Sequence, residues 1–151
     1  MNVKRPQKIS LIARPKDKFG ISVSEGYLLY SSLLDAIRES SPDISRHIHD
    51  SPISSISIGT LDGKFGKSIR QGHKTLDPSE MYVLDIAITD PKETEIFQAI
   101  IAPLILKERD LNLEKGNLRI EEASSTTASF EELLKKAKSF QDPCIDFRFK
   151  R

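Results

Sequence analysis

Two histidines separated by one residue are the first candidates for chemistry in this sequence. They lie in the stretch ISRHIHDSP, residues 44–52, where His47 and His49 precede Asp50. Histidine can ligate a metal ion, and it can also exchange a proton near neutral pH. On a helix, however, side chains two positions apart point in different directions, so these two would not share one ion. No second cluster of His, Cys and acidic residues appears at ligand spacing. We therefore expect neither a metal site nor a cofactor.

The remaining catalytic motifs can be tested against the spacing of their residues. The stretch GKFGKS, residues 63–68, has the lysine and serine of a phosphate loop, but Leu61 stands where that motif requires its first glycine. The signatures of serine hydrolases and zinc peptidases, GxSxG and HExxH, are missing. What remains for a histidine is acid–base catalysis without a metal, as in RNA cleavage by the RNA's own 2′-hydroxyl. That reaction needs a base, an acid and positive charge near the phosphate. A plain surface or capping histidine remains the alternative.

The composition predicts one soluble domain. The chain has 151 residues, of which 38% are hydrophobic and 30% charged. No apolar run approaches the roughly 20 residues that cross a bilayer, and the amino terminus lacks the pattern of a secretion signal. We therefore expect a cytoplasmic protein that makes no contact with a membrane. Cys144 is the sole cysteine, which excludes an internal disulfide and a zinc site built on paired cysteines.

Positive charge is concentrated in the first half of the chain. The formal net charge is only +1, yet residues 1–75 carry 12 basic and 7 acidic side chains. Runs of basic residues can neutralise nucleic-acid phosphates, although a solvated face without a partner is the alternative. The candidate RNA-binding residues are Lys4, Arg5, Lys64, Lys67, Arg70 and Lys74.

Hydrophobic periodicity predicts an α+β fold. Strands, some of them alternating every second residue, are expected at 8–14, 53–59, 81–89 and 144–150. Helices are expected at 25–40, 42–49, from 91 with a kink or early termination at Pro103, and from Ser129. Residues 60–67 read as a glycine-rich turn or hairpin tip, and residues 111–123 as a hairpin turning at Lys115, Gly116 and Asn117. This order favours helices on one face of an antiparallel sheet, in a βαββαβ scheme with insertions.

The run EGYLLYSSLLDAIRESSPDISRHIHDSP, residues 25–52, resembles the opening helix pair of a known family. In the CRISPR repeat-processing endoribonucleases of the RAMP superfamily, a helix with the pattern Y-x-L-x-S-x-I-Y-x-A-I leads through S-x-P to a short helix ending in L-H-E or L-H-D. Here that ending is Ile48, His49 and Asp50. The later order of strand, helix, hairpin, F-E-E-L-L and closing strand is also similar to the family's amino-terminal domain.

The resemblance implies both a fold and an activity. The fold would be a ferredoxin-like βαββαβ sandwich with an extra short helix and a β-hairpin insertion. The activity would be binding of CRISPR precursor RNA and metal-independent endoribonuclease cleavage within its repeats, leaving a 2′,3′-cyclic phosphate, as part of antiviral defence. The family's catalytic histidine falls on His49, whereas His47 has no family role.

Two further positions depart from the family's pattern. The tyrosine of some members falls on Leu34, which leaves Tyr30, one turn earlier, as a substitute; the lysine that follows the histidine is missing, which leaves Lys64 or Lys67 to stabilise charge. Core packing of Tyr30 and simple solvation of the lysines remain the alternatives.

The resemblance also bears on domain organisation and partners. We expect residues 1–151 to form a single ferredoxin-like domain, without the second such domain that is usual in the family. The chain would then be an endoribonuclease or, as the second hypothesis, a non-catalytic RNA-binding or protein-interaction module, truncated or split, that needs a partner. The expected partners are CRISPR repeat RNA together with a second ferredoxin-like domain or chain, a second copy of this chain as a homodimer, or a CRISPR effector complex.

Overall fold

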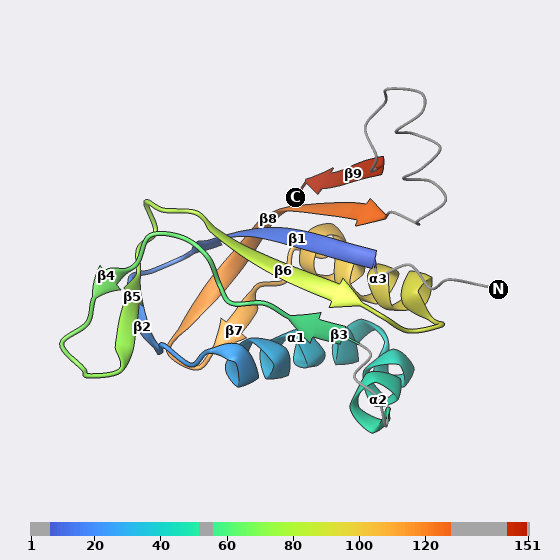
Figure 1. The fold of residues 1–151 in the computed structure, drawn as a ribbon, viewed down its shortest axis with the longest axis horizontal. Helices are drawn as coiled ribbons and strands as arrows, with labels where there is room; N and C mark the ends of the chain where they lie inside the picture. Colours follow the sequence, from blue (N-terminus) through green and yellow to red (C-terminus); the bar gives the residue numbers. More distant parts are fainter. Residues whose placement is uncertain (1–6, 52–55, 128–144, 151) are drawn as a thin grey trace, which may run out of the picture.

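The fold is built on one antiparallel sheet whose strands follow the order of a ferredoxin-like domain. The computed structural model describes residues 7–51, 56–127 and 145–150. The strands of this sheet lie in the order β3-β6-β1-β8-β7, with β9 also paired to β8 (Figure 1). Their bounds are β1 Gln7–Pro15, β3 Ile56–Ile58, β6 Tyr82–Ile88, β7 Leu111–Leu113, β8 Gly116–Thr127 and β9 Ile145–Lys150. With α1 between β1 and β3 and α3 between β6 and β8, the chain reads βαββαβ, which confirms the predicted fold class.

Strand β1 lies at the centre of the sheet, and its apolar residues alternate. Ile9, Leu11 and Ala13 are fully buried, and the residues between them face the other side. The strand pairs antiparallel with β6 on one side and with β8 on the other. Because only one face of the strand is fully buried, the strand keeps the period of two that its sequence shows.

The helices form one connected layer. They are α1 (Gly26–Ser40), α2 (Pro42–Asp50) and α3 (Glu93–Ile101), and α1 packs against both α2 and α3 as well as against β3 and β7. Helix α1 buries Leu29, Leu33, Ala36 and Ile37, the stripe expected from their spacing. Helix α2 begins at Pro42, whose ring suits a first helical position. No helix in the described part of the chain is long and apolar enough to span a bilayer.

The expected kink at Pro103 takes the form of a π-turn. Residues Ala102–Leu106 continue α3 as a π-helix, η1, in which the Lys107 N–H donates to the Ala102 carbonyl at 2.9 Å. Proline has no N–H to continue the α-helical pattern, and the wider turn accommodates its ring.

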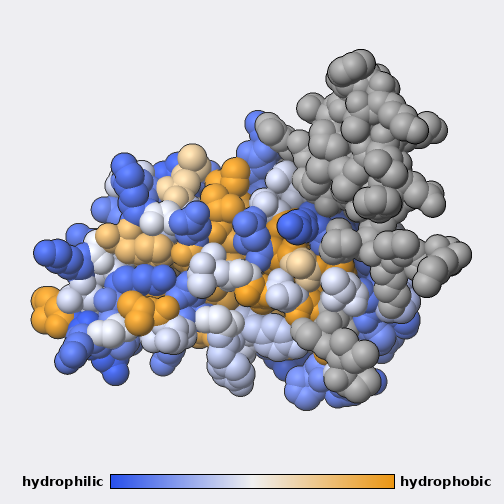
Figure 2. All heavy atoms as spheres, viewed as in Figure 1, coloured by the Kyte–Doolittle hydropathy of each residue, from blue (hydrophilic) through white to orange (hydrophobic). Residues whose placement is uncertain are grey.

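A second, smaller sheet was only partly predicted. It has the order β2-β5-β4, with β2 at Phe19–Ser22, β4 at Gly66–Lys67 and β5 at His73–Leu76 (Figure 1). Only part of 60–67 belongs to a hairpin, which spans β4 and β5 and has its tip at residues 68–72. The sheet adjoins the larger one where the Phe19 ring packs on Gly116, since a Cβ at Gly116 would overlap that ring. Over this end of the molecule, hydrophilic side chains lie among exposed hydrophobic ones (Figure 2), and Ile69 at the tip of the hairpin is fully exposed.

The remaining predictions differ in their outcomes. The hairpin of β7 and β8 turns at Glu114 and Lys115, so the predicted turn was one residue late, and Gly116 already pairs within the ladder. Glu114 has a φ of 47°, a conformation in which an L-residue is uncommon. The closing strand is present as β9. The helix predicted from Ser129 and the lone Cys144 lie outside the described residues.

Candidate functional site

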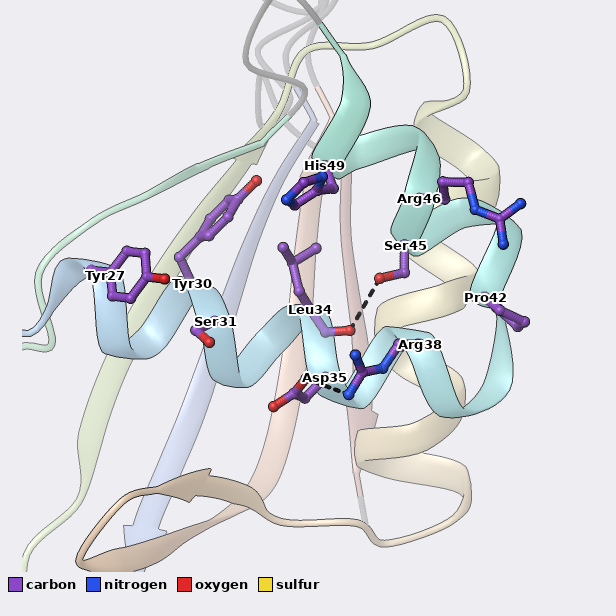
Figure 3. A pocket seen from close by; sticks show the side chains of 10 residues that line it. All are labelled: Tyr27, Tyr30, Ser31, Leu34, Asp35, Arg38, Pro42, Ser45, Arg46 and His49. Carbon is purple, nitrogen blue, oxygen red and sulfur yellow. Dashed lines mark hydrogen bonds and ion pairs between the residues drawn. The ribbon is translucent and has the colours of Figure 1, made fainter.

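A hollow of 480 Å³ opens between α1 and α2 (Figure 3). Two residues predicted to be catalytic, His49 and Tyr30, both line it. The full lining is Tyr27, Tyr30, Ser31, Leu34, Asp35, Arg38, Pro42, Ser45, Arg46 and His49. The two helices are held together here by a hydrogen bond of 3.4 Å from the Ser45 Oγ to the Leu34 carbonyl.

One stripe of α1 forms the floor of this hollow. Tyr27, Tyr30, Leu34 and Arg38 follow one another at three or four residues, so they lie along one face of the helix. Tyr30 and Leu34 are partly buried and pack against the hydrophobic core. Tyr30 therefore packs against the core, as one of its two expected roles requires, and also lines the hollow.

His49 lies over this stripe at the end of α2. Its side chain is 76% exposed, and Nδ1 lies 3.0 Å from the Asp50 Oδ1. Figure 3 shows its ring above Leu34, on the side of the hollow where Tyr30 projects. If Nδ1 donates its proton to that carboxylate, Nε2 is left as an acceptor. Such a tautomer suits a base.

His47 faces away from the hollow. Its Nε2 lies 3.1 Å from both carboxylate oxygens of Asp90, which is 7% exposed at the start of the α3 segment. Asp90 Oδ1 also accepts the Lys92 N–H at 2.8 Å. His47 thus joins α2 to the beginning of α3. In the described part of the chain, no three His, Cys, Asp or Glu side chains gather as potential metal ligands.

Two arginines of the hollow were not among the predicted site residues. Arg38 is 2.9 Å from the Asp35 Oδ1, one turn away on an exposed face of α1. Arg46 forms no ion pair within the described residues, and its guanidinium turns away from His49 in Figure 3. The signal for both was present in the sequence: Arg38 is four residues after Leu34, and Arg46 is three before His49.

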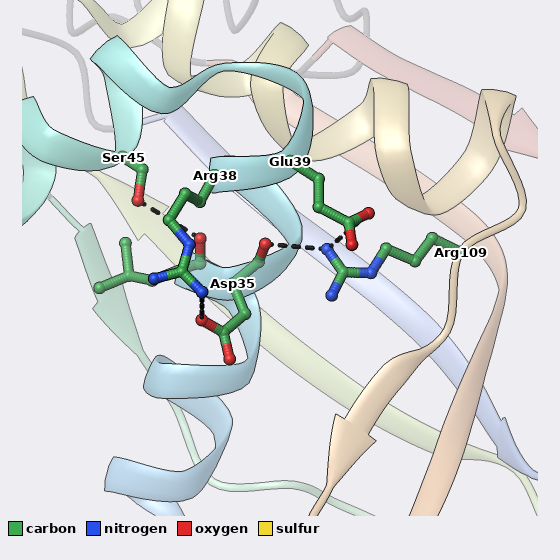
Figure 4. A network of polar contacts seen from close by, with 6 residues as sticks. Asp35, Arg38, Glu39, Ser45 and Arg109 are labelled. Carbon is green, nitrogen blue, oxygen red and sulfur yellow. Dashed lines mark hydrogen bonds and ion pairs between the residues drawn. The ribbon is translucent and has the colours of Figure 1, made fainter.

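A polar network fixes the end of α1 that carries Arg38 (Figure 4). Arg109 donates from Nη1 to the Asp35 carbonyl at 2.8 Å and lies 3.1 Å from the Glu39 Oε2. Arg109 follows the π-helix η1 in the chain. Its contacts with α1 therefore connect the segment after η1 to the helix that forms the floor of the hollow.

The predicted basic residues lie in a different part of the fold. Lys64, Lys67 and Arg70 are exposed on the small sheet and its approach, and none of them lines the hollow of His49 and Tyr30. The structure therefore does not bring Lys64 together with the other two predicted catalytic residues. Lys4 and Arg5 lie outside the described residues.

The loop that carries Lys64 rests on a buried tyrosine. The Tyr82 hydroxyl donates to the Lys64 carbonyl at 2.7 Å and accepts the Asp77 N–H at 3.0 Å. Burial raises the pKa of this hydroxyl above its ordinary value near 10. The Phe65 ring lies 4.9 Å from the Tyr82 ring, centroid to centroid.

Lys74 is engaged within the protein. Its Nζ lies 3.1 Å from the Glu25 Oε2 and 4.1 Å from the centroid of the Phe65 ring. The Glu25 side chain is 1% exposed, and its Oε1 accepts the Leu61 N–H at 3.0 Å. A carboxylate so deeply buried requires this cation, so Lys74 has a structural role whatever else it contacts.

Solved structures share this arrangement of strands and helices. A RAMP protein described as binding different RNA substrates superposes with a TM-score of 0.63 at 17% identity, over 82% of this chain and 49% of its own. The product of a Cas6-related gene from Pyrococcus furiosus gives 0.63 at 18%, over 80% and 47%. The chain has a Cas6-like RAMP fold. No protein-family model matches the sequence, and neither does any curated protein.

The solved structures differ in how much of their own length the superposition covers. This chain spans about half the length of the RAMP and Cas6-related proteins just described. By contrast, the protein superposes on a chain of a Csm3–Csm4 subcomplex of the type III-A CRISPR–Cas interference complex with a TM-score of 0.59 at 10% identity. This superposition covers 99% of the protein described here and 90% of the Csm chain.

Proposed function

We propose that this protein binds CRISPR repeat RNA and cleaves it within the repeat without a metal ion. The observation that carries the proposal is that His49 and Tyr30, from two separate helices, line one hollow in a fold of the RAMP type. One protein of similar fold binds different RNA substrates, and two others are a Cas6 protein and a Cas6-related one. These likenesses support an RNA substrate, and the hollow supports acid–base chemistry on it.

The proposed reaction is attack by the RNA's own 2′-hydroxyl on the adjacent phosphate. His49 removes the hydroxyl proton at Nε2, while Asp50 accepts the Nδ1 proton and keeps the ring in that tautomer. The new 2′-oxygen–phosphorus bond forms as the bond to the 5′-oxygen breaks, and the departing 5′-oxygen takes a proton from solvent, to which His49 is open. The products are a 2′,3′-cyclic phosphate and a 5′-hydroxyl. Tyr30 orients the reacting hydroxyl from the floor of the hollow.

The charge that develops on the phosphate needs a cation nearby. Arg38 and Arg46 line the hollow, whereas Lys64 does not. We therefore assign this role to the two arginines; the exposed side chain of Arg46, which points away from His49 in Figure 3, would turn toward the phosphate. We keep Lys64, with Lys67 and Arg70, as contacts to phosphates farther along the RNA. All three are exposed, as a salt-dependent RNA contact requires.

The second candidate function is a non-catalytic module within a CRISPR complex. It is favoured by the near-complete superposition on a chain of the Csm3–Csm4 subcomplex. We propose in either case that the domain works beside a second ferredoxin-like domain or chain, a second copy of itself, or an effector complex. In the non-catalytic case His49 would be an ordinary exposed residue.

One experiment separates the two functions. The purified protein is incubated in EDTA with labelled repeat RNA and with the same RNA carrying deoxyribose immediately upstream of the cut. Cleavage of the first substrate alone, lost in His49→Ala and retained in His47→Ala after correction for folded protein, supports the endoribonuclease. Binding of both substrates without cleavage supports the module. A His49→Ala protein that cleaves as fast as wild type would remove His49 from the mechanism.

A further inference from the structure

A second hollow, of 390 Å³, adjoins the first at Tyr27. It lies where the start of α1, strand β2 and the turn between β7 and β8 meet. Tyr27 contributes to the lining of both hollows, so its side chain borders each of them. The full lining of the second hollow is Gly20, Ile21, Ser22, Ser24, Glu25, Tyr27, Leu28, Arg70, His73, Leu113, Glu114 and Lys115.

Tyr27 is an exposed aromatic residue that does not pack against the core. Its side chain is 82% exposed, and it belongs neither to the core nor to the partly buried residues packed against it, unlike Tyr30 on the same stripe. No hydrogen bond holds its hydroxyl among the described residues. An exposed aromatic ring flanked by two hollows is the arrangement on which a nucleotide base stacks.

The second hollow contains cations for a phosphate. Arg70 and Lys115 are exposed, and neither forms an ion pair with another described residue. The imidazole of His73 also lines this hollow and can donate a hydrogen bond from a ring nitrogen. Two carboxylates also line the hollow, but that of Glu25 is neutralised by Lys74, which leaves the exposed Glu114 as the one opposing charge in the described lining.

We propose that Tyr27 is a stacking platform for a single-stranded flank of the RNA substrate. The strand passes from the hollow of His49 over the Tyr27 ring, and Arg70 and Lys115 hold the next phosphate in the second hollow. This inference rests on the proposed RNA substrate, and it extends the binding surface from α1 to the hairpin turns. The ligand class is a single-stranded ribonucleotide segment, which offers a free base face to an aromatic ring.

The test measures affinity by fluorescence anisotropy in EDTA, on RNA made uncleavable by deoxyribose at the cut. Two substrates are compared, one with single-stranded flanks and one trimmed to the reacting dinucleotide. Tyr27→Ala should weaken binding of the flanked RNA by about tenfold, while Tyr27→Phe, which keeps the ring, should not. The trimmed RNA should bind the three proteins alike.

Charge variants test the second hollow separately. Replacing Arg70 and Lys115 with alanine should reduce the slope of log affinity against log salt by roughly 0.7 for each phosphate that the protein no longer neutralises. Leu106→Ala and Lys107→Ala are matched controls, since both residues are exposed and line neither hollow. These controls should leave affinity and slope at the wild-type values.

The outcomes distinguish this inference from the proposed function. Equal affinities of wild type and Tyr27→Ala for the flanked RNA would overturn the stacking platform, even if the wild type cleaves RNA. Loss of affinity in Tyr27→Ala without any wild-type cleavage would uphold the platform and favour the non-catalytic module. A wild type that binds no RNA would overturn both.

Discussion

His47 Nε2 lies 3.1 Å from both carboxylate oxygens of Asp90, while His49, two residues later, lies over the hollow between α1 and α2. The first histidine joins two helical segments, and the second is 76% exposed. The pair that suggested a metal site in the sequence is thus divided between a structural and a chemical role.

This division predicts opposite effects of two alanine substitutions. His47→Ala removes a partner of the buried Asp90 and should reduce the free energy of unfolding by about 1–2 kcal/mol. Because His47 lies outside the hollow, cleavage per folded molecule should not change. His49→Ala should leave stability within about 0.5 kcal/mol of wild type and abolish cleavage. Urea denaturation and single-turnover rates measure both quantities. Equal loss of stability in the two variants would contradict the assignment.

The source of positive charge in the reaction gives a second prediction. Arg38→Ala and Arg46→Ala should each lower the single-turnover rate by about tenfold, less than the roughly 10²- to 10³-fold typical of a buried donor, because both are exposed. Lys64→Ala should instead weaken RNA binding at low salt and leave the rate at saturating protein unchanged. The reverse pattern, with the rate lost in Lys64→Ala, would restore the lysine to the catalytic site.

The buried Glu25–Lys74 pair gives a third prediction. Lys74→Ala leaves a carboxylate that is 1% exposed without its cation and should reduce the free energy of unfolding by about 2–3 kcal/mol. Glu25→Gln can still accept the Leu61 N–H and should be the milder change. Lys67→Ala, an exposed lysine of the same hairpin, serves as the control and should not alter stability. If Lys74→Ala has the same urea midpoint of unfolding as wild type, the Glu25–Lys74 pair contributes nothing to stability.

The raised pKa of Tyr82 gives a prediction for the stability of the protein at alkaline pH. Its pKa is raised in the folded state by burial, so above pH 10 the folded protein retains a proton that the unfolded chain releases. Stability from this group is complete below about pH 10 and falls as pH rises through the folded pKa. Tyr82→Phe should lower stability by about 1 kcal/mol at pH 7 and flatten the alkaline decline. The exposed Tyr27→Phe is the matched control. An unchanged decline in Tyr82→Phe would assign it to other groups.

Elements whose pattern is set within one segment were predictable from the sequence. The alternation of apolar residues in KISLIAR predicted β1. The spacing of apolar residues at 25–40 predicted both the helix α1 and the face that it buries. The proline at position 103 marked the departure from α-helix, although not its π form. In each case the spacing of apolar residues within one segment matches the face that is buried in the fold, so the segment alone is enough to predict the element.

Elements that depend on distant partners were missed. Strand β2 has four residues, FGIS, and its ladder with β5 joins Phe19 to Leu76, so neither strand carries enough alternation to be recognised alone. The hollow was incomplete for the same reason. Arg38 and Arg46 belong to different helices, and only the packing of α1 on α2 brings both to the same hollow. The position of Lys64 depends on another distant contact, the hydrogen bond from the Tyr82 hydroxyl to its carbonyl.

The central position of β1 also governs when the protein can fold. The strand pairs with β6, whose residues come about 75 positions later, and with β8, which ends at Thr127. During synthesis α1 and α2 can form as soon as they emerge, but the two ladders must wait until most of the chain has left the ribosome. Such distant pairings slow folding, because the long intervening loops close before contacts repay their entropy. Until β8 arrives, one edge of β1 has no strand to pair with, and that interval is when a nascent copy is most prone to aggregate.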